Sequence, residues 1–182
     1  MKPVTAQNNV DIRALALANA QIGGCEPLLD FARLVEEVLV EGEKAELVWS
    51  ASFETRAGAT GVMQPWMHLT LTVSLFLACQ RCMGAVAVPV VVDRWFRFVD
   101  SEEAAEREDE QSDEDVLVLE KQFRLHDLIE DEVLMSVPVV PRHETCPGNV
   151  ILSAVDPGFE LAQATKPMPF EALATLRNAK KG

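Results

Sequence analysis

The feature that most constrains the fold of this chain is an alternation of apolar and polar residues between positions 68 and 77. Successive side chains of a β-strand point to opposite faces, so a period of two predicts a strand with one buried face. The apolar members are Leu69, Leu71, Val73, Leu75 and Leu77, and they alternate with His68, Thr70, Thr72 and Ser74. The sequence therefore predicts a sheet of which one face is covered and the other faces water.

Neighbouring segments follow the same period. Residues 47–53 and 86–99 are predicted to form two further strands, and a short strand is expected at 116–119. Pro89 places the 86–99 strand at a sheet edge or a bulge, because proline has no N–H to donate. Consecutive strands favour an α+β fold with an antiparallel, barrel-like sheet and flanking helices, rather than a doubly wound parallel sheet.

Helical patterns flank the predicted strands. Residues 11–18 are expected to form a short helix that a glycine pair stops, and residues 31–40 a second helix with apolar residues at helical spacing. Asp127 is expected to be the N-cap of a third helix, with Glu130 completing a capping box and a double-proline segment ending the helix. The acidic triplet 130–132 cannot share one helical face and is expected to be solvated.

Length and composition indicate a single domain. A chain of 182 residues with 48% apolar residues can bury a core, so we expect one domain, 1–182, with an irregular tail from about residue 147 and a small helix at 169–176. No apolar run approaches the ~18–20 residues that span a bilayer. The first residues lack the apolar core of a secretory signal, so the protein is expected to be cytoplasmic and to make no membrane contact.

The net charge of −13 is unevenly distributed. Residues 100–115 hold ten acidic residues and one arginine, a local charge of −9, which leaves only −4 for the rest of the chain. Such a block is expected to be a flexible, solvated insertion. The overall charge argues against a general nucleic-acid coat, because phosphate binding needs a cationic footprint, but the folded part can still present a basic patch.

The cysteines are the most specific local signal. Cys79 and Cys82 lie in the string CQRC, which resembles half of a zinc knuckle, and the second half is expected to be His143 and Cys146 in HETC. Together they form a Cys₃His set that suits a structural zinc ion. A metal-free group of structural thiols is the alternative that the spacing leaves open. Redox CxxC pairs usually open a helix, whereas this pair lies between two predicted strands, which disfavours a redox role.

One basic-aromatic cluster is a candidate surface for RNA. Arg94, Trp95 and Arg97 lie in the 86–99 strand, and Arg81 lies in the turn before it. Arginine beside an exposed aromatic ring suits single-stranded RNA, through phosphate contact and base stacking. The alternative is an ordinary strand with its phenylalanines in the core and Arg94 outside.

Motifs for common enzyme chemistry are missing from the sequence. The chain has no phosphate-binding glycine loop, dinucleotide fingerprint, nucleophile elbow or zinc-protease helix motif. We therefore expect no enzymatic activity and no small-molecule substrate.

Several strings resemble one family, the large ribosomal RNA subunit accumulation proteins known as YceD. These are CQRC with the valine-rich strand ending in FRFV, then the acidic interruption, then DLIEDEVLMSVPVVPRH with the following cysteine, and finally PFEALATLR. The resemblance covers about residues 28–178. It implies a cytoplasmic, non-enzymatic role in the synthesis, processing or stability of large-subunit (23S) rRNA.

The leading hypothesis is a ribosome-biogenesis factor that acts on large-subunit rRNA precursor or on a basic ribosomal or assembly protein. The acidic segment could shield a basic protein or mimic RNA. Any RNA contact would use Arg81, Arg94, Trp95 and Arg97. The rival hypothesis is a thiol-redox or zinc-handling protein that uses Cys79 and Cys82.

The RNA hypothesis predicts the effect of reversing two charges on the basic strand. Arg94→Glu combined with Arg97→Glu should weaken association with pre-ribosomal particles, because it replaces cations by anions that repel phosphate. Co-sedimentation of the tagged variant with those particles measures the effect. Unchanged co-sedimentation would remove this cluster from the RNA-binding surface.

Overall fold

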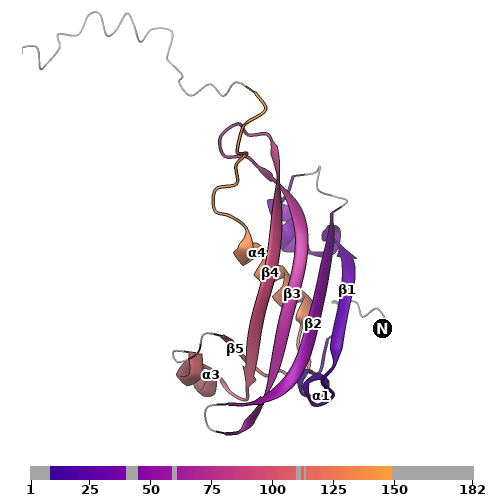
Figure 1. The fold of residues 1–182 in the computed structure, drawn as a ribbon, viewed down its shortest axis with the longest axis vertical. Helices are drawn as coiled ribbons and strands as arrows, with labels where there is room; N and C mark the ends of the chain where they lie inside the picture. The colour runs from indigo at the N-terminus through magenta and orange to yellow at the C-terminus, as the bar shows by residue number, and fades with distance from the viewer. Residues whose placement is uncertain (1–8, 40–44, 59–60, 110–111, 113, 149–182) are drawn as a thin grey trace, which may run out of the picture. The chain divides into compact units, whose positions relative to one another are not determined.

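The alternating run of the sequence is the central strand of a five-stranded sheet (Figure 1). The computed structural model describes residues 9–39, 45–58, 61–109, 112 and 114–148. The strands lie side by side in chain order, and they are β1 (Gln21–Pro27), β2 (Glu46–Ala57), β3 (Met63–Ala78), β4 (Ala85–Val99) and β5 (Asp115–Val118). The helical elements are α1 (Ile12–Leu17), the 3₁₀ turn η1 (Leu28–Asp30), α2 (Ala32–Glu37), α3 (Glu102–Asp109) and α4 (Leu125–Ser136).

The strands from β1 to β4 are antiparallel, and β5 runs parallel to β4. The register sets Leu71 opposite Trp49 on β2 and Val92 on β4, and all three side chains are buried. The predicted alternation on β2 and β3 is therefore confirmed, as is the α+β class. Pro89 pairs only with β3, because β5 reaches β4 at Phe96–Val99 alone, and the edge position predicted for this proline is confirmed.

The sheet is open, so the barrel-like closure predicted from the sequence is wrong. β1 pairs only with β2 and β5 only with β4, and no ladder joins these two edges within the described part of the chain. The physical reason is that helices cover the apolar face. Leu125, Ile129 and Val133 of α4 are fully buried in the same core as the inward side chains of β2, β3 and β4. A covered face needs no barrel closure to exclude water. We call the opposite face of the sheet, which carries Thr72, Ser74 and Val91, the open face.

Helix α4 begins three residues earlier than predicted. Its N-cap is Arg124, so Asp127 lies in the first turn, where its carboxylate pairs with Arg124 at 2.9 Å. The capping box predicted for Glu130 is wrong, because this side chain serves a different helix. Its Oε1 accepts hydrogen bonds from the backbone N–H groups of Arg33 (2.7 Å) and Leu34 (3.3 Å) at the start of α2.

Two residues of the acidic triplet on α4 are not solvated, whereas the third, Asp131, is half exposed as expected. Glu130 and Glu132 are each 5% exposed. Besides capping α2, Glu130 accepts a hydrogen bond from Arg33 Nε at 2.7 Å, and Glu132 lies 3.7 Å from an Arg94 nitrogen. Although burial opposes ionisation, the hydrogen bonds from Arg33 and Leu34 hold the pKa of Glu130 below its ordinary value. A buried carboxylate with three donors thus joins α4 to α2.

Besides the short 3₁₀ turn η1, two elements were not expected from the sequence. The glycine pair predicted to stop a helix lies inside strand β1, where a Cβ on Gly23 would come within 2.8 Å of the Trp49 carbonyl oxygen. The close approach of β1 and β2 therefore explains why residue 23 is a glycine, although glycine makes a strand harder to predict from the sequence.

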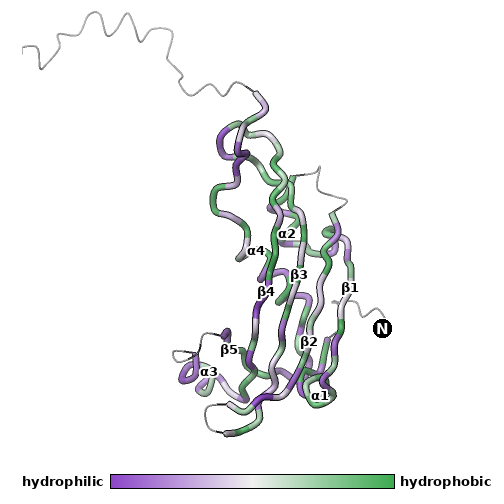
Figure 2. Tube along the Cα trace, viewed as in Figure 1, coloured by the Kyte–Doolittle hydropathy of each residue, from purple (hydrophilic) through white to green (hydrophobic). Residues whose placement is uncertain are grey.

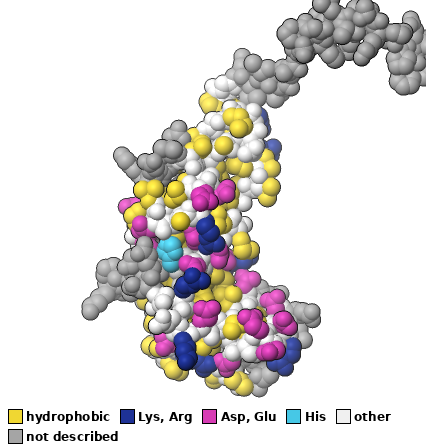
Figure 3. All heavy atoms as spheres, turned by 180° about the vertical axis from the view of Figure 1, so that it is seen from behind, with side chains coloured by type: hydrophobic (Ala, Val, Ile, Leu, Met, Phe, Trp, Pro, Cys, Tyr) yellow, Lys and Arg dark blue, Asp and Glu magenta, His cyan; other side chains and the backbone are white. Residues whose placement is uncertain are grey.

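The second unexpected element is α3, within the acidic segment expected to be a solvated loop. The Ser101 hydroxyl accepts from Ala104 N–H at 3.3 Å, as N-cap residues do, and two glutamates follow in the first turn, where the helix dipole favours negative charge. Figure 2 shows α3 as strongly hydrophilic, and acidic side chains gather over it in Figure 3. The helix has no fully buried residue.

The described residues up to Cys146 form one unit, and residues 147–182 are grouped separately. The predicted irregular tail and its helix at 169–176 lie outside the described residues, apart from the first two positions of the tail. No helix in the described ranges is long and apolar enough to cross a membrane.

The buried Glu130 predicts a defined loss of stability. Glu130→Gln should lower the free energy of unfolding at pH 7 by about 2 kcal/mol, because hydrogen bonds to a charged partner become bonds to a neutral amide. Glu36→Gln, at an exposed position of α2, makes the same charge change and should cost far less. Urea denaturation at pH 7 measures both.

The same pair of variants predicts a pH dependence. Because the folded-state pKa of Glu130 is lowered, its stabilisation is complete above the ordinary carboxyl pKa and is lost as the pH falls through the lowered value. The gap between wild type and Glu130→Gln should therefore narrow below about pH 4. A gap that stays constant with pH would contradict the charged cap.

Candidate metal centre

The turn between β3 and β4 arranges the first two candidate ligands. Met83 N–H donates to the Cys79 carbonyl oxygen at 2.8 Å, and Cys79 N–H donates to the Gly84 carbonyl oxygen at 2.8 Å. Met83 has φ +60°, a left-handed conformation that costs energy for a side chain of this size. The chain thereby reverses tightly around Cys79 and Cys82.

The second pair of ligands arrives on the segment after α4. Helix α4 ends at Ser136. The following segment contains Pro138 and Pro141, and proline is unfavourable inside a helix because it lacks a backbone N–H. Gln80 N–H donates to the Pro141 carbonyl oxygen at 2.9 Å, which ties this segment to the β3–β4 turn. His143 and Cys146 follow directly.

These contacts bring all four predicted ligands together. The ligand atoms of Cys79, Cys82, His143 and Cys146 all lie within 4.8 Å of one another. Cys79 Sγ is 4.0 Å from Cys146 Sγ, and Cys82 Sγ is 3.5 Å from His143 Nδ1. Tetrahedral coordination at ordinary zinc distances would separate two sulfurs by about 3.8 Å and a sulfur from a nitrogen by about 3.5 Å. The predicted convergence is confirmed, and the cluster could hold a metal ion.

The orientation of His143 is fixed by a second hydrogen bond. Its Nε2 lies 2.9 Å from the Ala85 carbonyl oxygen, which can only accept, so Nε2 carries the proton. The lone pair of Nδ1 is then left for the side that faces Cys82. Metal-binding histidines are commonly held by such a bond from the other ring nitrogen.

The electrostatics of the cluster favour a thiolate at one position. Burial opposes ionisation of Cys79, but hydrogen bonds from the backbone of Arg81, His143 and Cys82 outweigh it and lower the pKa of Cys79 to about 5. Burial and the two neighbouring sulfurs raise the pKa of Cys146. Thiolate is the form that binds metal, so this site favours a thiolate at Cys79 before any ion enters. Four protein ligands would complete a tetrahedral shell, as in structural sites.

The predicted RNA-contact residues do not form one surface. Arg94 lies on the helix-covered face of β4, where it pairs with Asp115 at 3.0 Å and approaches Glu132. Trp95 and Arg97 lie on the open face, and Arg81 is exposed in the turn beside the cysteines. Phe96 and Phe98 are buried in the core, as expected for an ordinary strand.

Three partners of Trp95 and Arg97 were missed from the sequence. The His68 ring stacks on the Trp95 ring, with centroids 4.4 Å apart, and the Arg56 guanidinium carbon is 4.0 Å from the Trp95 centroid and 4.8 Å from that of Trp66. We call Arg56, Trp66, His68, Trp95 and Arg97 the open-face cluster. Strand parity would have placed His68 and Trp66 on one face, but the pairing register decides which β4 residues they meet.

His68 has a carboxylate partner that the sequence did not indicate. Its Nε2 is 2.6 Å from Asp93 Oδ1 on the adjacent strand. Cys25, in contrast, is exposed on β1, where its thiol contacts Glu46, and it takes no part in the four-residue cluster.

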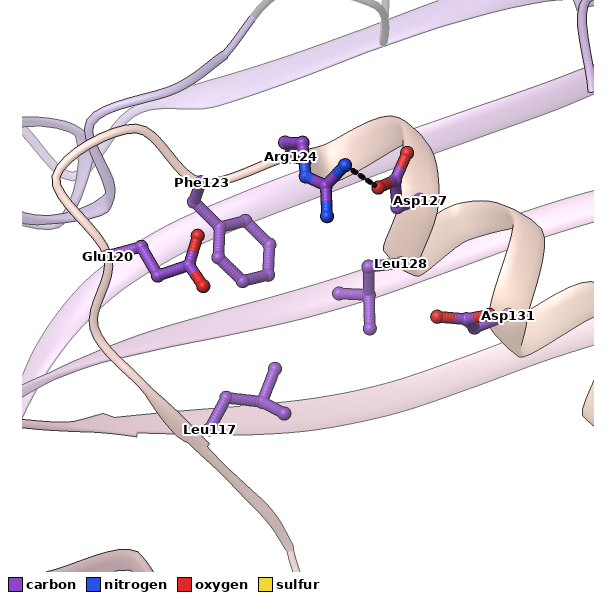
Figure 4. A pocket seen from close by; sticks show the side chains of 7 residues that line it. All are labelled: Leu117, Glu120, Phe123, Arg124, Asp127, Leu128 and Asp131. Carbon is purple, nitrogen blue, oxygen red and sulfur yellow. Dashed lines mark ion pairs between the residues drawn. The ribbon is translucent and has the colours of Figure 1, made fainter. Parts of the chain in front are cut away.

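A separate hollow of about 200 Å³ lies between β5 and α4 (Figure 4). Apolar side chains of Leu117, Phe123 and Leu128 line it together with Arg124 and three carboxylates, and Arg124 is paired with Asp127. Its lining contains no thiol, hydroxyl or imidazole group. The chemistry-bearing residues are concentrated at the cysteine cluster instead.

The fold and the site together define an α+β protein with an open sheet and a Cys₃His cluster at the β3–β4 turn. The family model described as large ribosomal RNA subunit accumulation protein YceD matches residues 67–177, more than half of the chain. The chain belongs to this family. Searches of curated proteins and of solved structures gave no significant match.

Proposed function

We propose that this protein is a non-enzymatic ribosome-biogenesis factor that supports the synthesis, processing or stability of large-subunit (23S) rRNA. The observation that carries the proposal is the family match over residues 67–177. The matched region contains β4, α4 and the complete Cys₃His cluster. Its partner would be large-subunit rRNA precursor or a basic ribosomal or assembly protein in the cytoplasm.

The binding residues proposed for RNA are Arg81, Arg94, Trp95 and Arg97. Trp95 and Arg97 share the open face, which makes them the stronger pair for a common ligand. Arg94 is engaged by Asp115 and Glu132, so its substitution would also disturb the contact between β4 and α4. The acidic segment that contains α3 is negatively charged, and it is the part of this protein that would contact a basic protein partner.

We propose in addition that the Cys₃His cluster binds zinc in a structural role. Three sulfurs and one imidazole form a donor set that zinc prefers, and the Cys79–Cys146 and Cys82–His143 separations are close to the edges of a tetrahedron. The ion would hold the segment after α4 against the β3–β4 turn. Its role would be to fix the position of that segment relative to the turn.

A thiol-redox function is the second candidate. The observation that favours it is the lowered pKa of Cys79, because a thiolate is also the reactive form in disulfide exchange. The structure pairs Cys79 with Cys146 at 4.0 Å, whereas the redox hypothesis used Cys79 and Cys82. A bound zinc ion would occupy all of these sulfurs and suppress the exchange.

The zinc proposal predicts a fixed metal content. The wild-type chain should contain about one zinc ion, and Cys146→Ser should lose it, because the fourth ligand is then missing. Cys25→Ser removes a thiol outside the cluster and should keep the metal. Elemental analysis of the purified proteins, with thermal unfolding before and after chelation, measures the effect. A zinc-free wild type that forms a reversible Cys79–Cys82 disulfide would instead support the redox candidate.

The function itself predicts a ribosome phenotype. Cells depleted of this protein should lose large ribosomal subunits selectively, with low or unprocessed 23S rRNA, and re-expression of the wild-type chain should restore both. Sucrose-gradient profiles with rRNA quantification measure this. Normal profiles during ordinary growth and cold stress would contradict the proposed function.

A further inference from the structure

Helix α3 places a carboxylate on the buried arginine of the open-face cluster. Arg97 Nη1 is 2.6 Å from Glu108 Oε2, and the Arg97 side chain is only 7% exposed. Gln64 Nε2 donates to the same carboxylate oxygen at 3.2 Å, and Arg97 Nη2 donates to Ser112 Oγ at 2.8 Å. One anionic group from the acidic segment therefore occupies donors of both β3 and β4.

This anion leaves donors of the cluster unused. Trp66 Nε1 and Arg97 Nε are buried and have no hydrogen-bond acceptor within the described part of the structure. Both residues are more than nine-tenths buried. Buried polar groups without partners are rare and costly in folded proteins. The site thus offers more donors than Glu108 satisfies.

The same face continues into a surface suited to an extended ligand. Trp95 is partly exposed and already stacks with His68 and Arg56. Next to it, a hollow of about 280 Å³ runs across β2, β3 and β4, lined on the open face by Ser50, Thr70, Thr72, Val48, Val91 and Asp93. An aromatic ring beside two arginines and a row of hydroxyls is the chemistry that binds single-stranded nucleic acid by stacking and phosphate contact.

We propose that the open-face cluster is a single-stranded RNA site that Glu108 of α3 occupies as an internal competitor. The ligand class rests on the proposed function, whereas the competition rests on the Arg97–Glu108 contact. RNA binding would require the carboxylate to leave Arg97, which then meets a phosphate. The site can bind RNA only while α3 is displaced. The apparent association constant for RNA is therefore the intrinsic constant multiplied by the fraction of molecules in which α3 is displaced. The acidic helix would thereby restrict binding to RNA that binds tightly or that is present at high local concentration.

Two charge-matched variants of α3 test the competition. Glu108→Gln removes the carboxylate that contacts Arg97, and Glu106→Gln makes the same charge change at an exposed position of the same helix. The probe is a fluorescein-labelled single-stranded RNA of about ten nucleotides, followed by anisotropy at about 100 mM KCl. Glu108→Gln should bind roughly tenfold more tightly than wild type, as expected if the site is open about a tenth of the time. Glu106→Gln should stay close to wild type.

Variants on the open face test the location of the site. Arg56→Ala and Trp95→Ala, each made in the Glu108→Gln background, should lose most of the gained affinity. Both residues are partly exposed and lie outside the metal cluster, and unchanged thermal unfolding would confirm that the fold is kept. Retained affinity in both variants would overturn the assignment of the site.

The remaining outcomes also decide the proposal. Equal tightening by Glu108→Gln and Glu106→Gln would show a general charge effect and overturn the competition, as would no change in either. Binding of a lysine-rich peptide that Glu108→Gln weakens would make α3 a docking element for a basic protein, which also overturns it. If any of these occurs while depleted cells still lose large subunits, the proposed function stands and only this inference fails.

Discussion

The pairing of β3 with β4 is the constraint on which the rest of the structure depends. The two strands are joined from Trp66 opposite Arg97 to Ala78 opposite Ala85, and most of their buried apolar side chains point to one face. This register fixes where the chain must turn, and the turn is where Cys79 and Cys82 lie. It also assigns each β4 side chain to a face, which separates Arg94 from Trp95 and Arg97. The metal cluster and the open-face cluster are two consequences of one ladder.

The strands and the metal ligands could be predicted because their signals are local. Alternation indicates a half-buried strand wherever it occurs, and two pairs of ligands, each with two intervening residues, indicate a shared ion. The sequence could not show that Glu130 caps α2, because that contact joins residues of two different helices. Nor could it show that His68 meets Asp93, since only the register decides which residues on adjacent strands are opposite or diagonal.

Other differences between the predicted and the observed structure arose where one sequence pattern is compatible with two structures. The glycine pair in β1 resembles a helix stop, although close contact with Trp49 of β2 explains the absence of a side chain at Gly23. The dense negative charge of residues 100–115 predicted a flexible insertion, although the segment contains a helix with a serine N-cap. The barrel-like sheet was expected from the consecutive order of the strands alone, and that order does not show that α4 covers the apolar face.

The position of the Cys₃His cluster has a topological consequence. Its two halves lie on either side of β4, α3, β5 and α4, so an ion bound there would close a single long loop around all four elements. Such a crosslink acts on the unfolded chain by removing conformations in which the loop ends are apart. The closure entropy grows only with the logarithm of loop length, by about 0.6 kcal/mol per doubling. The acidic segment could therefore lengthen or shorten considerably with little effect on how firmly the two ends are held together.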